Sequence, residues 1–373
     1  MGLPGDIRRM ARGSDLWRES CPDWAEAGSF LLLNPRMDPT RREQVLAAEF
    51  PDLKDHVWLA TSGTGGTLKI VALSRGALEC SATAVNHHFG ASRDDMWLNA
   101  LPLFHVGGLG IMARSHLSRA RCEMFADAWD PQRFVIAARS CGATLSALVP
   151  TQVHDVVRAG LRAPGSLRAV VVGGGALSGK LFQSAAELGW PLLPSYGLTE
   201  ASSQVATMNS GGEFSAWLPL LSHVEARVDA DGVMEVRGDS LLTGWMIFDE
   251  RGIGRWEAPK KDGWYRTGDR AELRGRDVRI LGRIDDLVKI RGELVDVAAV
   301  GRALQERVAS GCVFVCAEAD ERNGSVLCVQ AENDVALSEA KAALDVFPPF
   351  ARPEIYRVAP VERTALGKPL RSL

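Results

Sequence analysis

The segment HVWLATSGTGGTLK, residues 56–69, joins an apolar run to a loop rich in glycine and threonine. The apolar run predicts a buried strand. In the loop, three glycines let backbone N–H groups approach an anion closely, hydroxyl groups add further donors, and Lys69 adds a positive charge. This composition favours a polyphosphate site, with a flexible hairpin as the alternative. The loop is not a Walker A motif, because the Gly-Lys-Ser/Thr ending is absent.

Predicted strands and helices alternate after this loop. Short apolar runs that predict further buried strands lie at 96–101, 145–150 and 168–174. Between them, we expect Ser74 to cap a helix that runs to about Phe89, and Asp130 to open a helix that runs to Ser140. The alternation predicts an α/β fold with a large layered N-terminal domain whose sheets are mainly parallel.

The pattern changes in the later part of the chain. Residues 221–280 are typical of short strands and turns, with an Asp-Gly hairpin signal at 231–232. We expect a domain boundary at 283–286, so that residues 1–283 form the large domain and residues 284–373 a small, mobile α+β cap domain. Within the small domain, the pattern predicts strands near 287–291, 312–317 and 325–331, helices near 297–308 and 337–346, and a last short strand.

Composition places the chain among ordinary globular proteins. Of its 373 residues, 46% are hydrophobic and 24% are charged, which excludes a disordered or fibrous chain. The net charge of −3 argues against a dedicated nucleic-acid binder, and no apolar stretch is long enough to span a membrane. Seven cysteines are scattered without the spacing of a zinc site, which indicates reduced thiols. We therefore expect a soluble, cytoplasmic enzyme without a nucleic-acid or membrane partner.

Three later segments carry residues suited to a nucleotide. Glycines at 173–175 follow a predicted strand and let a flat ring approach the backbone. In SYGLTE, residues 195–200, Tyr196 can stack on a base, and a hydroxyl beside the Glu200 carboxylate suits Mg²⁺; a turn with a helix-capping threonine is the alternative. In GWYRTGD, residues 263–269, Asp269 can accept both ribose hydroxyl groups.

Together and in this order, these segments resemble the adenylate-forming superfamily, which includes acyl-CoA synthetases, firefly luciferases and the adenylation domains of peptide synthetases. The resemblance extends over roughly residues 56–373. LPLFHVGGLGIMARS at 101–115 and YGLTEASSQVAT at 196–207 are most similar to the o-succinylbenzoate–CoA ligases of menaquinone biosynthesis. The resemblance implies a ligase that uses ATP and Mg²⁺ to adenylate a carboxylic acid and then passes it to coenzyme A. It also implies a monomer or a homo-oligomer with small-molecule partners.

The resemblance also implies roles for individual residues. The loop over the ATP phosphates would comprise Ser62, Gly63, Thr64, Gly65, Gly66, Thr67 and Lys69. Gly174, Gly175 and Ala176 would line the adenine site and Tyr196 would stack on the base, while Ser195, Gly197 and Thr199 would also bind the nucleotide. Asp269 would hold the ribose hydroxyl groups, Arg283 would contact the ribose or a phosphate, and Lys289 and Gly292 would line the thiol tunnel. Thr64 and Glu200 would lie near Mg²⁺, Asp285 would be the hinge, and Lys368 would be the adenylation lysine.

The acyl pocket carries the remaining implied residues, His105, Gly107, Arg114 and Ser203. With Lys368, Thr64 and Glu200, His105 completes the expected catalytic set, although a core histidine is the alternative for it. Arg114 lies in an apolar, helix-like stretch, where a cation suggests a second substrate carboxylate. The alternative for Arg114 is an arginine that extends to the surface.

Three features depart from the family pattern. The stretch before the glycine-rich loop is shorter than usual, residues 297–300 lack the usual acidic residue, and Glu362 stands where proline is usual. These departures leave open a reduced or altered activity. The alternative functions are an AMP-forming CoA ligase for another aryl or short-chain acid, and a non-catalytic nucleotide-binding homologue.

Overall fold

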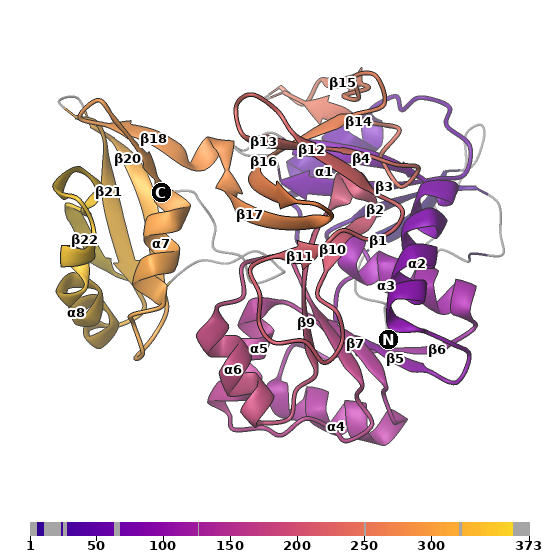
Figure 1. Cartoon of the computed structure of the whole chain (residues 1–373). Coiled ribbons are helices and arrows are strands. Elements are labelled where there is room, and N and C mark those ends of the chain that lie inside the picture. The colour runs from indigo at the N-terminus through magenta and orange to yellow at the C-terminus, as the bar shows by residue number, and fades with distance from the viewer. Residues whose placement is uncertain are drawn as a thin grey trace. The chain divides into compact units, whose positions relative to one another are not determined.

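The computed structural model describes residues 6–10, 24, 28–62, 68–125, 127–249, 251–320 and 323–360 (Figure 1). The chain divides into two compact units. The first comprises residues 1–227, 235–266 and 274–278, and the second comprises residues 228–234, 267–273 and 279–373. The expected domain boundary after residue 283 stays a prediction.

The first sheet contains the strand that precedes the glycine-rich loop. Its order is β1 (Asp6–Met10), β2 (Ser29–Leu33), β3 (His56–Ser62), β4 (Leu68–Ser74), β14 (Gly244–Phe248) and β15 (Gly254–Glu257). Only β2 and β3 are parallel, and the other neighbours are antiparallel. Trp58 is fully buried and packs with Leu31, Ile70 and Phe248, and Val45 of α1 (Pro39–Ala47) joins this core. Alternate apolar side chains of these strands therefore pack together in one hydrophobic core.

The second sheet confirms the predicted α/β architecture. Its order is β10 (Ser203–Thr207), β9 (Leu192–Leu198), β8 (Ala169–Val172), β7 (Leu145–Leu148), β5 (Met96–Asn99) and β6 (Arg121–Met124). All neighbours are parallel except β9 and β10. The helices of this region are α2 (Arg75–Phe89), α3 (Val106–Ser118), α4 (Pro131–Cys141), α5 (Pro150–Arg158) and α6 (Gly179–Glu187). Strands β5, β7 and β8 are buried along their length, as continuous apolar runs predict.

The two predicted helix starts are confirmed at the level of single hydrogen bonds. Ser74 Oγ accepts from the N–H of Ala77 at 3.1 Å, and Asp130 Oδ1 accepts from the N–H of Arg133 at 2.8 Å. Each oxygen satisfies a backbone donor that has no partner within its helix.

A third sheet has the order β11 (Leu218–Pro219), β17 (Asp277–Arg283), β16 (Tyr265–Arg274), β13 (Val233–Arg237) and β12 (Glu225–Val228). The predicted turn at 231–232 joins β12 to β13. Gly232 adopts a positive φ of 76° there, and its N–H donates to the carbonyl of Asp229 at 3.0 Å. The short strands and turns expected in this region are therefore present.

The second unit contains a β-hairpin and a three-stranded sheet with two helices. The hairpin pairs β18 (Leu287–Ile290) with β19 (Glu293–Asp296), and the sheet has the order β20 (Val313–Asp320), β21 (Gly324–Ala331) and β22 (Ile355–Val358). Leu304 of α7 (Val297–Gln305) and Val329 belong to its hydrophobic core.

The expected helix at 337–346 is displaced in the structure. Helix α8 spans Asp334–Ala342, because the Asn333 side chain accepts from the N–H of Ala336 at 2.9 Å and starts the helix early. A 3-10 turn at Leu344–Val346 follows it.

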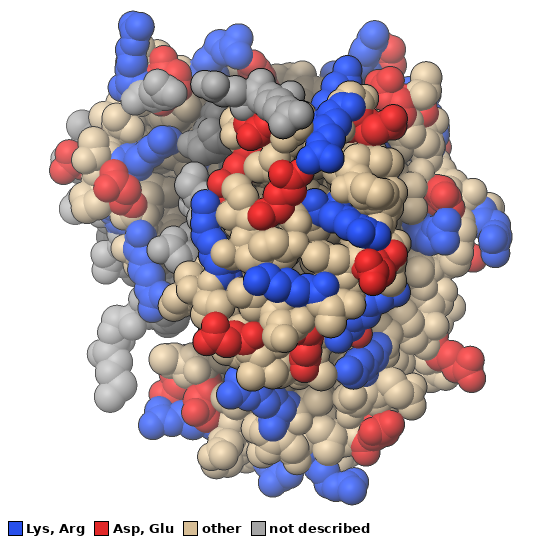
Figure 2. All heavy atoms as spheres, turned by 90° about the vertical axis from the view of Figure 1, so that its left-hand side faces the viewer, with Lys and Arg blue, Asp and Glu red and all other residues tan. Residues whose placement is uncertain are grey.

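Charged side chains of both signs are interspersed on the face drawn in Figure 2. This mixture matches the near balance of 43 basic and 46 acidic residues. Within the described ranges, no helix is both long enough and apolar enough to cross a lipid bilayer.

Candidate active site

The glycine-rich segment connects two antiparallel strands. Strands β3 and β4 pair from His56 with Ser74 to Ser62 with Leu68, so the segment closes a hairpin. Residues 63–67, including Thr64, lie outside the described residues, and their phosphate-binding role stays a prediction. Lys69 lies at the base of the hairpin, with its Nζ 4.1 Å from the centroid of the Trp245 ring. A cation over an aromatic face is held in a defined position.

The glycines of residues 173–175 lie where β8 ends. A Cβ atom on Gly173 would lie 3.7 Å from the carbonyl oxygen of Ser195, and one on Gly175 would lie 3.5 Å from Pro150. These neighbours follow β7 or belong to β9, so three adjacent strands meet here. Gly174 has a φ of 80°, and Gly174, Gly175 and Ala176 are exposed. Ligands of parallel α/β sheets bind at this carboxyl edge.

The predicted adenine segment runs along β9 into a tight turn. Ser195 Oγ lies 3.0 Å from Thr207 Oγ1 across the β9–β10 pair. Gly197 leaves no room for a side chain, since a Cβ there would lie 2.1 Å from the carbonyl oxygen of Ser203. Tyr196 is partly buried. The structure therefore brings the segment beginning at Ser195 to the same sheet edge as the glycines of residues 173–175.

The proposed Mg²⁺ residue Glu200 lies in a 3-10 turn at Thr199–Ala201. The carbonyl oxygen of Glu200 accepts from the N–H of Leu242 at 2.8 Å, which fixes the turn. Its carboxylate is partly buried and follows the hydroxyl of Thr199. Carboxylate and hydroxyl oxygens fit a hard cation such as Mg²⁺.

A tight turn places His105 at the start of α3. Asn99, at the end of β5, accepts from the N–H of Leu101 at 3.0 Å and donates to the carbonyl of Gly108 at 3.0 Å. A Cβ on Gly108 would lie 2.4 Å from the carbonyl oxygen of Pro102, so only glycine fits. The His105 ring packs on Phe104 with centroids 4.6 Å apart. Gly107 lies in the first turn of the helix, where a Cβ would lie 3.1 Å from Leu101.

Arg114 projects from α3 into the interior of the first unit. It is 2% exposed, its Nη2 donates to Ser203 Oγ at 2.9 Å, and its Cζ lies 6.0 Å from the Trp97 ring centroid. Gly110 makes room for it, because a Cβ there would lie 3.1 Å from Nη2. The alternative of a surface arginine is therefore wrong.

No carboxylate forms an ion pair with Arg114 in the part of the chain that the structure describes. Burial lowers the pKa of the guanidinium to about 9, which leaves it charged at pH 7. A buried charge without a counter-ion is costly unless a ligand supplies one.

The predicted ribose residues lie in the second unit. The Asp269 N–H donates to Thr267 Oγ1 at 3.1 Å, and Arg283 Nη1 lies 3.4 Å from Asp269 Oδ1. Arg283 Nη2 also lies 3.4 Å from the predicted hinge residue, Asp285. Burial acts against the charge on Arg283, but the nearby carboxylates outweigh it and raise the pKa. Asp269 and Arg283 are thus brought together.

The residues expected to line the thiol tunnel lie on the β18–β19 hairpin. Lys289 belongs to β18 and pairs with Leu294, and Gly292 lies in the turn with a φ of 87°. Both are exposed. Lys368 lies outside the described residues, so its role as adenylation lysine stays a prediction.

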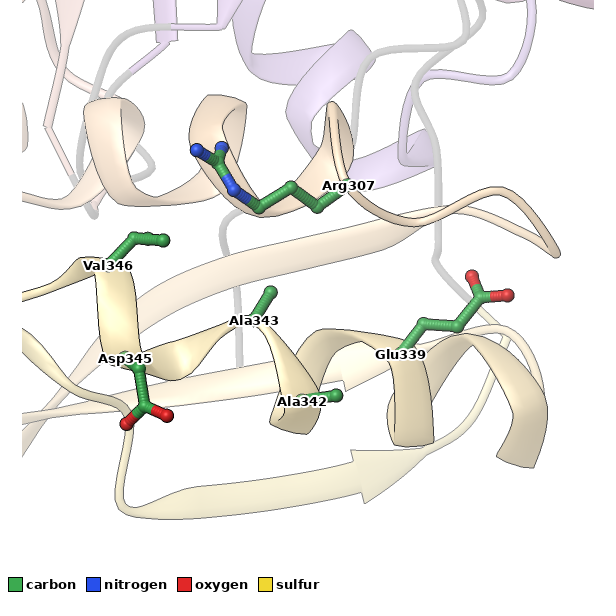
Figure 3. Close-up of a pocket in the computed structure, with 6 residues that line it drawn as sticks. All are labelled: Arg307, Glu339, Ala342, Ala343, Asp345 and Val346. Atoms are coloured by element: carbon green, nitrogen blue, oxygen red, sulfur yellow. The ribbon is translucent and has the colours of Figure 1, made fainter.

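An open depression of about 440 Å³ lies on the second unit, and none of the residues that line it is a predicted site residue (Figure 3). Arg307 follows α7, and Glu339, Ala342, Ala343, Asp345 and Val346 come from α8 and the following turn. Arg307 Nη1 donates to the carbonyl of Ala303, and Glu339 accepts from two backbone N–H groups. Arg307 and Glu339 are therefore already hydrogen-bonded to nearby backbone groups. The residues that line the depression do not form a group of side chains that point to one reacting centre.

Sequence reasoning missed one grouping of potential metal ligands. Ligand atoms of Cys316, Glu318 and Cys328 lie within 4.8 Å of one another, because β20 and β21 pair residues far apart in sequence. Glu318 is already bound by both Arg357 nitrogens, at 2.5 and 3.1 Å. Burial raises the pKa of the Cys328 thiol to about 12, which keeps it protonated. In the chain as described, Arg357 therefore engages the carboxylate and the Cys328 thiol is protonated, whereas the thiolate is the form that binds a metal.

Comparison with known proteins identifies the family. The family described as AMP-binding enzyme matches residues 34–240 of this chain. The chain belongs to this family. Its match contains the glycine-rich hairpin, residues 173–176, the turn at Glu200 and Arg114.

Individual curated proteins give a more specific similarity than the family does. The chain is 29% identical over 303 residues to a 2-succinylbenzoate–CoA ligase from Bacillus cereus, which covers 78% of this chain and 62% of that protein. It therefore spans about three fifths of the length of the curated relatives it matches.

Solved structures show the same fold. A variant of the Escherichia coli enzyme MenE with bound OSB-AMS has a TM-score of 0.73 and 26% identity, over 88% of this chain and 77% of that chain. The Bacillus subtilis o-succinylbenzoate coenzyme A synthetase, in complex with ATP and a magnesium ion, has a TM-score of 0.72 and 25% identity, over 87% of this chain and 72% of that chain.

Proposed function

We propose that this chain is an AMP-forming acid–CoA ligase that adenylates o-succinylbenzoate and transfers it to coenzyme A, as in menaquinone biosynthesis. The observation that carries the proposal is Arg114, a buried guanidinium without a carboxylate among the described residues. It lies in a unit whose parallel sheet brings residues 173–176 and the segment beginning at Ser195 to one edge. A substrate with two carboxylates supplies one to react and one to meet Arg114.

The reaction has two balanced steps. In the first, a carboxylate oxygen of the acid forms a bond to the α-phosphorus of ATP while the bond to pyrophosphate breaks. In the second, the thiol sulfur of coenzyme A bonds to the acyl carbon, AMP leaves, and the thiol proton passes to solvent. The protein has to bring two anions together and to neutralise developing charge.

Residues of this chain divide these tasks. The backbone of the glycine-rich hairpin and Lys69 would hold the phosphates, and residues 173–176 with Tyr196 would hold the base. Glu200 and Thr64 would bind Mg²⁺, which neutralises phosphate charge when bound. Lys368 is a compact cation that can bridge the carboxylate and phosphate oxygens. The proposal draws support from the shared sheet edge, from the family match and from relatives named 2-succinylbenzoate–CoA ligase.

The direct test is pyrophosphate release from ATP and Mg²⁺ with o-succinylbenzoate, measured with and without coenzyme A. We expect release that depends on the acid, and thioester formation only with coenzyme A. A panel of other aryl and short-chain acids distinguishes the first alternative. ATP binding without pyrophosphate release from any acid would favour the non-catalytic alternative.

The variant Lys368→Ala tests the assigned mechanism. Removal of one preorganised donor lowers a rate by roughly 10²–10³-fold, so we expect adenylation to fall by that factor. Thioester formation from supplied acyl-adenylate should remain largely intact, since that step does not need the bridging cation. Lys54→Ala, which changes an exposed lysine of the first unit, is the matched control. Equal losses in both half-reactions would contradict this role for Lys368.

A further inference from the structure

The segment after β11 runs beside β10 and carries a histidine to its start. Ala206 forms an antiparallel bridge with Leu220, and the N–H of Leu221 donates to the carbonyl of Val205 at 2.9 Å. Beyond this pairing the chain turns, since the N–H of Val224 donates to the carbonyl of Leu221 at 3.2 Å, and His223 lies in this turn, near the end of β10 that begins at Ser203. Ser203 is the residue that binds Arg114.

The imidazole of His223 has unused hydrogen-bonding capacity. Both ring nitrogens are buried, and neither has a hydrogen-bond partner among the residues that the structure describes. Burial, followed by the positive charge of Arg114, lowers the pKa of His223 to about 4, so the ring is neutral at pH 7. A neutral imidazole has one N–H donor and one acceptor. The electrostatic effect of Arg114 on this pKa is consistent with the two side chains lying in the same region of the first unit.

Further polar atoms around Ser203 are buried without partners in the described ranges. They are Arg114 Nε and Ser240 Oγ. Ser240 lies beside the turn before β10, because its carbonyl accepts from Ser202 Oγ at 2.7 Å. Native proteins leave few buried polar groups unsatisfied, so this concentration requires an explanation.

The chemistry of this cluster selects an anion. It contains the Arg114 cation, the Ser203 hydroxyl and a neutral imidazole, and it contains no aspartate or glutamate in ion-pair contact within the described residues. Donors of this kind satisfy a carboxylate, which accepts several hydrogen bonds at two oxygens. A carboxylate also pairs with the guanidinium that nothing else neutralises.

Resting on the proposed function, we propose that His223 is a specificity-determining residue that donates its ring N–H to the non-reacting carboxylate of the acid substrate. Arg114 and His223 then bind the same carboxylate from α3 and from the segment beside β10. The subsite favours dicarboxylic acids over monocarboxylic acids of the same size. His223 takes no part in bond making, so it acts on KM and not on kcat.

The test compares His223→Leu with the wild-type chain. Three acids are used: o-succinylbenzoate and two analogues that each lack one of its carboxylates, 2-butyrylbenzoate and 4-oxo-4-phenylbutanoate. Pyrophosphate release gives KM for o-succinylbenzoate, and inhibition of that release gives Ki for each analogue, whether or not it is turned over.

We expect His223→Leu to raise KM for o-succinylbenzoate by about 10- to 100-fold, the effect of losing a hydrogen bond to a charged group. Ki should rise by a similar factor for the one analogue that retains the recognised carboxylate, and should stay unchanged for the other. His223→Gln retains an N–H donor and should recover part of the affinity. It also provides a second variant if the leucine variant does not fold. His87→Leu, the same change on the exposed face of α2, should alter none of these constants.

The outcomes separate the two proposals. An active wild-type chain in which His223→Leu changes all three constants equally, or none of them, overturns the role of His223 alone. A wild-type chain that releases no pyrophosphate with any acid overturns the proposed function, and the inference with it.

Discussion

Asp95 and Arg114 are two buried charges of the first unit, 6% and 2% exposed, with opposite surroundings. Asp95 accepts from Arg168 Nε at 2.8 Å and Nη2 at 2.7 Å, from Thr144 Oγ1 at 2.7 Å and from the N–H of Ser92 at 2.9 Å. Arg114 has one side-chain hydrogen bond, to Ser203, and no carboxylate among the described residues. The fold neutralises one charge, and the proposed function assigns the other to a ligand.

The buried charges of Asp95 and Arg114 differ in how burial and hydrogen bonds set their pKa. Burial raises the pKa of Asp95, but hydrogen bonds from Arg168, Thr144 and Ser92 outweigh it and lower the pKa to about 2. The fold therefore stabilises the charge that it contains. At Arg114, burial is the cause of the lowered pKa, so the folded protein disfavours the charge. Binding of an anion would offset this cost. We expect mutations at Asp95 to affect stability and mutations at Arg114 to affect recognition.

The largest effect is expected for Asp95→Ala. This change removes a buried charge and leaves three donor residues without their acceptor, so the free energy of unfolding should fall by about 3–5 kcal/mol. Denaturant titration measures it. Substrate discrimination should be unchanged in the folded fraction. A loss below about 1 kcal/mol would show that the cluster is not a stabilising centre.

The pH dependence of stability tests this comparison further. His223, in the region of Arg114, and Asp95 contribute to it in different pH ranges. His223 has a normal pKa of 6.5 when unfolded and about 4 when folded, so the folded state binds fewer protons between these values. Stability should therefore fall as the pH drops from about 6.5 to 4, by at most about 3 kcal/mol. Protonation there adds a charge beside Arg114 and near Arg276, which donates to the carbonyls of residues 221 and 224.

His223→Leu should remove that part of the pH dependence. The contribution of Asp95 should persist above pH 4 and disappear only as the pH falls towards 2, since its pKa is lowered on folding. Unfolding free energies of both chains, measured at intervals from pH 7 to 4, check this. Identical slopes for the two chains would contradict the assignment to His223.

The smallest change in stability is expected for Arg114→Leu. KM for o-succinylbenzoate should rise by about 10- to 100-fold, while the analogue that lacks the recognised carboxylate is unaffected. The free energy of unfolding should stay constant or rise by about 1 kcal/mol, because a buried charge without a counter-ion is removed. Equal changes in KM or Ki for all of the acids, together with a lower free energy of unfolding, would show that Arg114 has a structural role like that of Asp95.

Local features of the fold could be predicted from the sequence, and long-range ones could not. Ser74 and Asp130 cap helices through residues three positions away, so a short window contains the whole signal. The segments that carry the family resemblance could be recognised because their residue types and order are distinctive, and the family match supports that resemblance. The surroundings of Arg114 depend on Ser203, 89 residues away, and on the pairing of the segment at 220–221 with β10, after which the chain turns at His223. Periodicity within one element contains no information on such contacts.

The position of Arg114 near the Trp97 ring gives the chain an internal optical probe. Trp97 is fully buried, and the guanidinium carbon lies 6.0 Å from its ring centroid. An acid that neutralises this cation changes the electric field across the indole, and with it the wavelength of emission. Fluorescence titration should therefore follow occupancy of the proposed acyl pocket without a label, and the variant Trp97→Phe should lack the shift.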